Sequence, residues 1–585
     1  MDFGAQDEVV RFLASLDGGA ADIVTTHISV VALCRTRAYK LKKAVRFPYL
    51  DFSTPSRRLE MCEREVALNM RFAPELYLGA HRVTREANGA LALDGAGETI
   101  DAVVVMRRFA DGDLMEQVAR DGRLTRDMVE SLARRIARTH DEAAPDYERG
   151  GAAAMRRTLD DTSLSLRNAG AASAERIEAL VTRQGEALAA QAALLDKRKA
   201  QGKVRRCHGD LTLRNICLFE GAPTLFDCLE FDDEMATIDV LYDVGFLLMD
   251  FWRAEARAFA NLALNRYLDA RDEADGLPLL PLFLSLRAAI RAHVEASQQN
   301  AERGRLYFDL AATLLAPSKG AVIAIGGLSG SGKSSVAAAL APSIGCPPGA
   351  RIINSDRIRK RLFGLPPTAR LPQDAYASAV SAKVYDEMFE AAARTAELGW
   401  PVIVDAVFDR PEDRAAIKAA AGRARAPFFG VWLDLDLTRR AARVEARIND
   451  VSDATCEVLT AQMKKATGAI EWLKVDASKD TTNIAAEIKA QAMLYELHRQ
   501  LARAVDEART LKEDIQPRAA EALKETEYAY ERGRYGYLEL VDAQREYLAL
   551  QTALIDSAAG AHALRTEIER LTNAPLNQAD DSPTS

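Results

Sequence analysis

The chain has 585 residues, a formal net charge of −8 at pH 7 and a pI near 5.7. Its length predicts two to four domains, each large enough to bury its own core. The excess of acidic residues argues against a surface that binds nucleic acid or an anionic membrane. The seven cysteines form no C-x-x-C pair, which favours reduced thiols in the cytoplasm. We expect neither a secretory signal nor a membrane span.

The N-terminal part, residues 20–312, opens with short strand-like runs at 24–34 and 38–43 and becomes mostly helical after about residue 115. The second run carries Lys40 and Lys42. Residues two apart in a strand point to the same face, so both lysines are expected on one side of a sheet.

A catalytic-loop pattern lies within this part, where residues 207–217 read Cys-His-Gly-Asp-Leu-Thr-Leu-Arg-Asn-Ile-Cys. A His-x-Asp element with an asparagine five residues after the aspartate is typical of protein-kinase-like phosphotransferases. Asp210 would accept the proton of an acceptor hydroxyl, and Asn215 would hold Mg²⁺. Asp227, at the end of an apolar strand, has the position of a second metal-binding carboxylate.

On these motifs, residues 20–312 resemble the aminoglycoside phosphotransferase family, which shares the protein-kinase fold. The resemblance implies a bilobal α+β domain that uses ATP (or GTP) and Mg²⁺. Either Lys40 or Lys42 could contact the phosphates. Lys40 fits the family spacing better, and Glu65 in the next helix is expected to be its partner. The sequence departs from the pattern at residues 25–29, which contain no glycine-rich loop.

A phosphate-binding loop begins the second part of the chain. The apolar run 321–325 leads into Gly-Gly-Leu-Ser-Gly-Ser-Gly-Lys-Ser-Ser at 326–335, which fits G-x-x-x-x-G-K-[ST]. The backbone N–H groups of such a loop cradle phosphates, and the helix that follows adds positive potential. Lys333 would reach the β- and γ-phosphates, and the Ser334 hydroxyl would hold Mg²⁺. The predicted nucleotide-binding residues are Gly327, Ser329, Gly330, Ser331, Gly332, Lys333, Ser334 and Ser335.

Residues 318–483 alternate apolar strands with helical stretches, which predicts an α/β domain with a parallel sheet covered by helices. The expected strands are 321–325, 351–354, 401–405 and 428–433. This part resembles the small-molecule P-loop kinases of the gluconate-kinase and zeta-toxin type.

The second resemblance implies roles for several residues beyond the phosphate loop. Asp356 would act as the base toward an acceptor hydroxyl, and Arg359 would bind an anionic substrate. Asp405 ends a strand and would act on Mg²⁺ through water. Arg443 and Arg447 lie four residues apart, on one helix face, and would close over the transferred phosphate as lid arginines.

A third part begins at residue 484, where apolar residues recur at three- and four-residue steps, the pattern of a coiled-coil seam. The pattern breaks at 533–536 and then resumes, which predicts an antiparallel helical hairpin over 484–573 and a disordered tail over 574–585. Residues 515–544 resemble the last coiled-coil hairpin of TolC-type outer-membrane efflux proteins, but the barrel strands of those proteins are missing. An exposed seam would allow self-association.

The leading hypothesis is a cytoplasmic ATP-dependent phosphotransferase with two kinase-type sites. Its acceptor would be a small hydroxyl-bearing molecule that the sequence does not identify. One alternative is a regulatory protein in which the kinase-like lobe senses a ligand and only the P-loop domain hydrolyses nucleotide. The other is an outer-membrane efflux component with fused domains.

Overall fold

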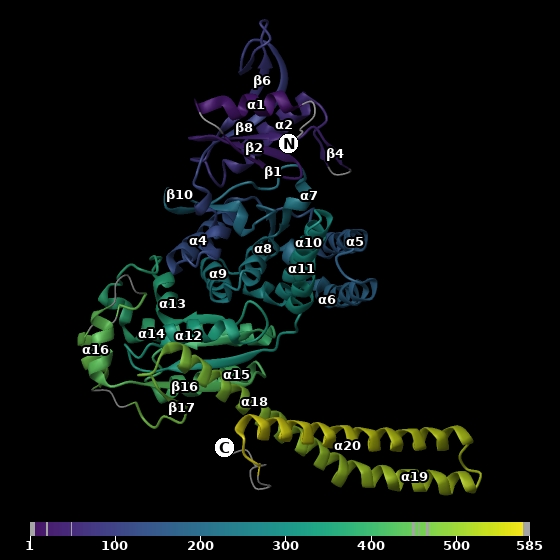
Figure 1. Cartoon of the computed structure of the whole chain (residues 1–585). Coiled ribbons are helices and arrows are strands. Elements are labelled where there is room, and N and C mark those ends of the chain that lie inside the picture. Colours follow the sequence, from purple (N-terminus) through teal and green to yellow (C-terminus); the bar gives the residue numbers. More distant parts are fainter. Residues whose placement is uncertain are drawn as a thin grey trace.

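The structure is a computed structural model that describes residues 6–18, 21–47, 50–446, 451–453, 456–463 and 467–576. A bilobal α+β domain, a P-loop α/β domain and a helical hairpin follow one another along the chain (Figure 1). This arrangement confirms the predicted fold class.

The upper lobe of the bilobal domain is an antiparallel sheet with a helix on each face (Figure 1). Tyr39 and Leu41 pack with α1 (Asp7–Ser15), while Lys40 and Lys42 point toward α2 (Pro55–Asn69). This split follows from the two-residue period of a strand. The strand order is β1 (Asp22–Thr25), β2 (Ser29–Leu33), β3 (Arg37–Lys42), β8 (Glu98–Arg107), β6 (Tyr77–Arg85) and β7 (Leu91–Leu93).

The run at 24–34 forms two strands rather than one. β1 and β2 pair as a hairpin, and the backbone N–H of Thr26 donates to the carbonyl of Ser29 at 2.9 Å to close the turn. The turn falls within residues 25–29, the segment in which the sequence contains no glycine.

The lower lobe is mainly helical, and its central helix α8 (Val240–Arg253) is buried along most of its length. Two short ladders frame the catalytic-loop segment: β9 (Val204–Arg206) pairs with β12 (Thr237–Asp239), and β10 (Ile216–Phe219) pairs with β11 (Ala222–Leu225). The other main helices are α3 (Met115–Arg120), α4 (Arg126–Glu142), α5 (Gly151–Ala169), α6 (Ala174–Ala200), α9 (Arg257–Ala270), α10 (Leu280–Ser297) and α11 (Ala301–Leu314).

Among the described residues, one helical segment, Ala274–Ser297, is long and apolar enough to cross a membrane. Within its most apolar window 72% is buried inside the lobe. Its hydrophobicity is therefore that of a helix in the core of this lobe.

The P-loop domain is a five-stranded parallel sheet with helices on both faces. Helices α14 (Ser378–Glu397) and α15 (Pro411–Arg423) cover one face, and α12 (Lys333–Leu340) and the start of α18 (Thr481–Thr510) cover the other. The four predicted strands are confirmed, and an edge strand that was not predicted, β17, completes the sheet. The order is β14 (Arg351–Asn354), β15 (Pro401–Asp405), β13 (Ala321–Gly326), β16 (Phe428–Asp434) and β17 (Leu473–Asp476).

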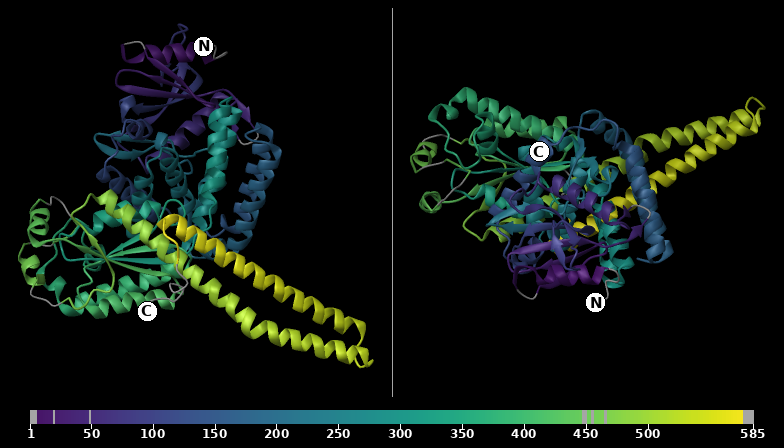
Figure 2. Two further views of the ribbon diagram at one scale, coloured as in Figure 1. Left: turned by 60° about the horizontal axis from the view of Figure 1, so that its bottom comes forward. Right: turned by 90° about the horizontal axis from the view of Figure 1, so that it is seen from above.

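The C-terminal hairpin projects from the body as two long antiparallel rods (Figure 2). α18 passes through a π-helical turn at Leu511–Ile515 into α19 (Gln516–Glu531), and α20 (Tyr537–Thr572) returns beside them. The chain reverses at 532–536, as predicted. The expected tail lies mostly beyond residue 576, outside the described residues.

The helix α18 belongs to two parts of the molecule at once. Its first turns bury Ile484, Ala485 and Ile488 in the core of the P-loop domain. The helix therefore crosses the predicted boundary at 483/484, because these apolar residues cover one face of the P-loop sheet instead of forming the hairpin seam.

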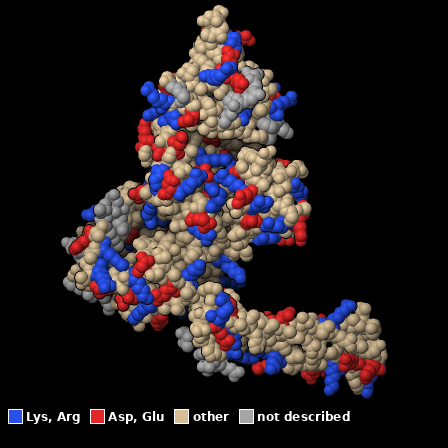
Figure 3. All heavy atoms as spheres, viewed as in Figure 1, with Lys and Arg blue, Asp and Glu red and all other residues tan. Residues whose placement is uncertain are grey.

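The distal hairpin is much less buried than its root. Leu538 of α20 is 74% exposed and Ile555 is 66% exposed. Much of the hairpin side seen in Figure 3 is uncharged, and charged side chains gather toward its far end.

Candidate nucleotide and catalytic sites

The catalytic loop of the bilobal domain is fixed from below by one buried carboxylate. Asp243, near the start of α8, accepts the backbone N–H of Gly209 at 2.8 Å and that of His208 at 3.4 Å. Within the loop, the Asn215 side-chain amide donates to the Asp210 carboxylate at 2.7 Å and to the Asp210 carbonyl at 2.8 Å. The predicted base and the predicted metal ligand therefore stand side by side.

Two further contacts hold this arrangement. His140 of α4 bonds Asp243 Oδ2 at 3.1 Å and the hydroxyl of Tyr267 at 2.9 Å. His208 Nε2 contacts the carbonyl of Phe226 at 2.9 Å, which ties the loop to the residue before Asp227. Burial is the largest single influence and would raise the pKa of the Asp243 carboxyl, but His140, His208 and the N–H of Gly209 together lower it.

The upper lobe presents two lysines to three carboxylates. Lys40 Nζ lies 2.8 Å from Glu65 Oε1 and also contacts Asp227 across the lobes. Lys42 Nζ lies 2.7 Å from Glu65 Oε2 and 2.5 Å from Glu230 Oε1. Glu65 thus bridges the two lysines that the sequence left as alternatives, and Lys40 is the one that reaches Asp227.

This cluster is charged and mostly buried, and Asp227 is its most exposed member. Burial alone would lower the pKa of Lys40, but the Asp227 and Glu65 carboxylates raise it well above its usual value. Burial raises the pKa of Asp227, and the Lys40 ammonium more than reverses this. Both groups therefore keep their charges at neutral pH, as a phosphate-binding lysine and a metal-binding carboxylate must.

The backbone at Asp227 has an unusual conformation for a residue with a side chain, with φ of +59°. Its N–H is held by the hydroxyl of Tyr77 at 3.1 Å. Strained backbone of this kind persists where surrounding contacts determine it, and it is common at functional sites.

In the P-loop domain, the glycine-rich turn has the conformation that a phosphate cradle requires. Gly330 and Gly332 have φ of +84° and +91°. A Cβ on Gly330 would lie 2.7 Å from the carbonyl oxygen of Arg440. Within the described residues, Ser331 Oγ is buried and has no hydrogen-bond partner. An orphaned hydroxyl inside the turn fits a site built for a polar ligand such as a phosphate.

The two predicted Mg²⁺ residues of this domain, Ser334 and Asp405, contact each other. Ser334 Oγ, in the first turn of α12, donates to Asp405 Oδ2 at 2.6 Å. Asn354, at the end of β14, donates to the same oxygen at 2.7 Å. Hydroxyl and carboxylate oxygens are ligands that suit Mg²⁺, so this donor set fits the ion. Ser335 is exposed on the next position of α12.

Helix α13 (Ser355–Leu362) carries the residues predicted to meet the acceptor. Asp356 is near Asp405 and Lys333, and burial together with the Asp405 charge raises the pKa of its carboxyl. Arg359 donates to the carbonyl of Ala375 at 2.7 Å. Within the described part of the chain, its Nε is buried without a hydrogen-bond partner.

The lid arginines are only partly visible in the structure. Arg443 of α16 (Leu437–Glu445) donates to the carbonyls of Ser331 at 3.3 Å and Ala477 at 3.0 Å, so it lies against the phosphate loop. Arg447 lies outside the described residues. Ser329 bonds Gln462 of α17 (Cys456–Met463) through its backbone N–H and its hydroxyl, each at 3.0 Å.

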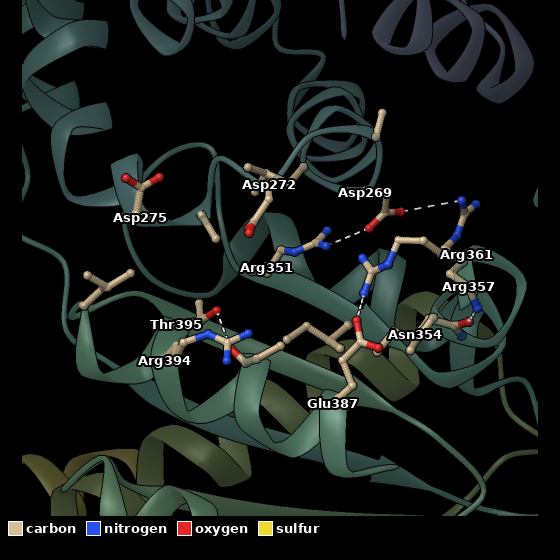
Figure 4. A pocket seen from close by; sticks show the side chains of 17 residues that line it. Asp269, Asp272, Asp275, Arg351, Asn354, Arg357, Arg361, Glu387, Arg394 and Thr395 are labelled. Carbon is tan, nitrogen blue, oxygen red and sulfur yellow. Dashed lines mark hydrogen bonds and ion pairs between the residues drawn. The ribbon is translucent and has the colours of Figure 1, made fainter. Parts of the chain in front are cut away.

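A cavity of about 540 Å³ lies between the two domains (Figure 4). The end of α9 and the turn after it form one wall, and β14, α13 and α14 form the other. Several charged side chains along the walls are already paired, Arg351 with Asp269 and Arg361 with Glu387.

Sequence patterns did not identify several residues of these sites. Asp243 and His140 support the catalytic loop from helices distant in sequence. Lys42 pairs with Glu230. The alternation of side chains along the strand predicted only the side of the sheet on which Lys42 lies. Asn354 ends a predicted strand, but no sequence pattern identified it as the partner of Asp405. In each case the contact that gives the residue its role joins elements distant in the sequence, so local residue spacing does not predict it.

Two family models match separate parts of the chain. Residues 37–279 match the family model described as phosphotransferase enzyme family, and residues 322–469 match the model described as AAA domain. Neither match reaches the C-terminal hairpin, whose resemblance to TolC-type proteins stays a prediction.

Relatives over most of the chain carry no assigned function. Uncharacterized proteins of Mycobacterium bovis and Mycobacterium tuberculosis are 28% identical over 457 residues, which is 75% of this chain and 89% of theirs.

Solved structures resemble single domains. A gluconokinase from Sinorhizobium meliloti is 22% identical and covers 30% of this chain and 94% of its own, with a TM-score of 0.22. A choline/ethanolamine kinase family protein from Mesorhizobium loti is 13% identical and covers 53% and 94%, with a TM-score of 0.35. On the family matches, the chain joins a phosphotransferase-type domain at residues 37–279 to a P-loop domain at residues 322–469.

Proposed function

We propose that this protein transfers the γ-phosphoryl group of ATP (or GTP) to small hydroxyl-bearing acceptors at two separate sites. The observation that carries the proposal is the P-loop arrangement, in which Ser334 and Asp405 meet beside Lys333 and the orphaned hydroxyl of Ser331. The catalytic loop of the bilobal domain supports a second site of the same chemistry.

At the P-loop site, Asp356 would take the proton of the acceptor hydroxyl. The acceptor oxygen attacks the γ-phosphorus, a new P–O bond forms, and the bond to the β–γ bridging oxygen breaks with its electron pair leaving on the nucleoside diphosphate. The raised pKa of Asp356 makes this carboxyl a better base than an ordinary surface aspartate. Lys333 and Arg443 would stabilise the charge that develops on the phosphoryl oxygens.

At the site of the bilobal domain, Asp210 has the corresponding role of base. Lys40, held by Glu65, would contact the nucleotide phosphates, and Asn215 and Asp227 would hold the metal. Mg²⁺, when bound, neutralises phosphate charge at both sites. In the described structure Lys40 is paired directly with Asp227, so nucleotide binding would have to separate these two side chains.

The acceptor of the P-loop site is proposed to be anionic. Arg359 is 5% exposed, stacks over the ring of Tyr376 at 4.9 Å and keeps a buried N–H unsatisfied. Lys360, on the same side of α13, bonds Asp453 at 3.2 Å. A carboxylate or phosphate on the acceptor would satisfy the guanidinium.

Substitution of the P-loop lysine tests whether the P-loop arrangement is a catalytic site. Lys333→Ala should reduce nucleotide turnover by about 10²-fold or more, because the charge clamp on the transferred phosphate is removed. Residual turnover should require Asp210. A Lys333→Ala protein that hydrolyses ATP at the parent rate would show that the P-loop is not a catalytic site.

A second candidate is a regulatory protein in which the bilobal domain senses a ligand and the P-loop domain alone hydrolyses nucleotide. The buried hydrogen bonds between α9 and β14 favour this candidate, because they connect the bilobal domain directly to the P-loop sheet. Asp210→Asn separates the two: it should remove one class of phosphorylated product in the first case and none in the second.

We also propose that the protein is cytoplasmic and binds no nucleic acid or membrane. The negative net charge supports this, as do the free thiols of the six cysteines whose side chains the structure describes. The exposed apolar residues of α20 further support self-association through the hairpin.

A further inference from the structure

Helix α13 is a wall shared by two compartments. Residues three and four apart lie on one face of a helix, and Asn354, Arg357, Ile358 and Arg361 line the cavity between the domains. The other face carries Asp356 and the two basic residues that follow it at 359 and 360. Any displacement of this helix therefore moves the proposed base of the P-loop site.

The strand that leads into α13 is held by the bilobal domain. β14 is an edge strand of its sheet, and edge strands leave backbone groups unpaired. Asn265 of α9 fills this edge: its Oδ1 accepts the N–H of Ile352 at 2.7 Å, and its Nδ2 donates to the carbonyl of Ala350 at 3.2 Å. Asn261, one turn earlier, donates to the same carbonyl at 3.0 Å.

Ion pairs continue the contact from the strand into the helix. Asp269, at the end of α9, lies 2.7 Å from Arg351 of β14 and 3.5 Å from Arg357 of α13. Glu130 of α4 reaches the same Arg357 at 3.4 Å. Asn265 is fully buried and Arg351 nearly so, so these polar groups depend on one another to be satisfied.

The chain of contacts ends at the metal-site residues. Asn354, the last residue of β14, accepts the N–H of Arg357 at 3.0 Å through Oδ1 and donates through Nδ2 to Asp405 at 2.7 Å. Asp405 in turn holds Ser334. Contacts with the bilobal domain therefore help to fix the position of Asn354, and Asn354 in turn contacts Asp405 of the P-loop site.

We propose that Asn265, Asp269 and Glu130 of the bilobal domain are positioning residues for phosphoryl transfer at the P-loop site. They fix β14 and α13, and through them they place Asp356 against the acceptor and Asn354 against Asp405. The P-loop site is then a composite of both domains. This inference rests on the proposed function of that site.

The test uses full-length protein with Asp210→Asn as background, so that turnover comes from the P-loop site, and water as the acceptor during ATP hydrolysis. Asp269→Asn should lower kcat by about 10-fold, because small displacements of catalytic groups have effects of this size. KM for ATP should change by less than about 2-fold, since the phosphate loop itself is not touched. Asp269→Glu should recover part of kcat.

Asp272→Asn is the matched control. Asp272 lines the same cavity, yet within the described residues its carboxylate has no ion pair or hydrogen bond, so kcat should be unchanged. Glu130→Gln, which perturbs Arg357 from another helix, should lower kcat in the same direction and guards against an Asp269 variant that misfolds.

Hydrogen exchange separates this inference from the proposed function. Amides of residues 354–362 should exchange faster in Asp269→Asn and in Glu130→Gln than in the parent or in Asp272→Asn. If Lys333→Ala shows that no turnover comes from the P-loop, the proposed function is wrong, and the exchange result still decides the positioning role. Unchanged exchange in both variants, or an unchanged kcat with measurable turnover, would overturn the inference.

Discussion

At the scale of single residues, the two sites depend on side chains whose charge or shape has been fixed by burial. Glu65 is completely buried between Lys40 and Lys42. Removing one member of such a cluster leaves an uncompensated buried charge, which costs more than the pair contributes. At Gly330 the constraint is steric, because the tight turn leaves no room for a side chain.

Gly330→Ala should weaken nucleotide binding by about 10-fold or more. The new methyl group would need a strained φ and would lie 2.7 Å from the carbonyl oxygen of Arg440, which is backbone and cannot swing away. Titration with a fluorescent nucleotide measures the affinity. Gly422→Ala in α15 is the control, because a Cβ there meets no atom within 4 Å and alanine is the better helix former. Equal affinity in both variants would contradict the cradle described for this loop.

His293 of α10 should make the lower lobe sensitive to mild acid. Burial, assisted by the Arg291 guanidinium, lowers the pKa of His293 to about 4 from 6.5. The unfolded chain therefore binds a proton at pH values where the folded imidazole stays neutral, and the stability present above pH 6.5 is lost as the pH falls toward 4. The loss should be about 1 kcal/mol by pH 5.5. Thermal midpoints at pH 7.5 and 5.5 should differ less in His293→Gln than in the parent; equal differences would show that His293 is not the titrating group.

At the scale of elements, the sequence was most informative where one local pattern performs the chemistry. The phosphate loop and the catalytic loop are both contiguous, and glycine, lysine and aspartate spacing was enough to place them. Strand β17 escaped prediction because Leu473–Asp476 is short and half polar. The role of Asn265 escaped because its partners at 350 and 352 are on another domain. Local spacing cannot report contacts that only tertiary packing creates.

Helix α18 leads to a prediction about where the P-loop domain ends. A chain ending at Lys489 keeps Ile484, Ala485 and Ile488, so its thermal midpoint and nucleotide affinity should match those of the full-length protein. A chain ending at Asp480 exposes the sheet face that these residues cover and should lose several degrees or fail to fold, since each large buried aliphatic residue contributes about 2–5 kcal/mol. Equal midpoints for the two truncated chains would place the domain end before α18.

At the scale of the whole molecule, two kinase-type domains share a buried seam, and a long hairpin projects from its root in the P-loop domain (Figure 2). The distance between hairpin and body means that the apolar residues of α20 contribute little to either catalytic domain. They remain available to another chain, and a second copy of the hairpin offers the matching pattern.

Sedimentation should therefore detect self-association that depends on the hairpin. The full-length chain should sediment as a dimer or larger species at micromolar concentration, and the chain ending at Lys489 should sediment as a monomer. Leu548→Glu and Ile555→Glu together should have the effect of the truncation, because they place charge on residues that are 63% and 66% exposed. A full-length chain that stays monomeric would contradict this prediction.

We propose that one chain carries two separate phosphoryl-transfer sites. The most direct measurement incubates a metabolite extract and γ-labelled ATP with four proteins: the parent, Asp210→Asn, Lys333→Ala and the double variant. We expect each single variant to lose a different set of labelled products and the double variant to make none. Labelled products from the double variant, or the same products lost from both single variants, would contradict it.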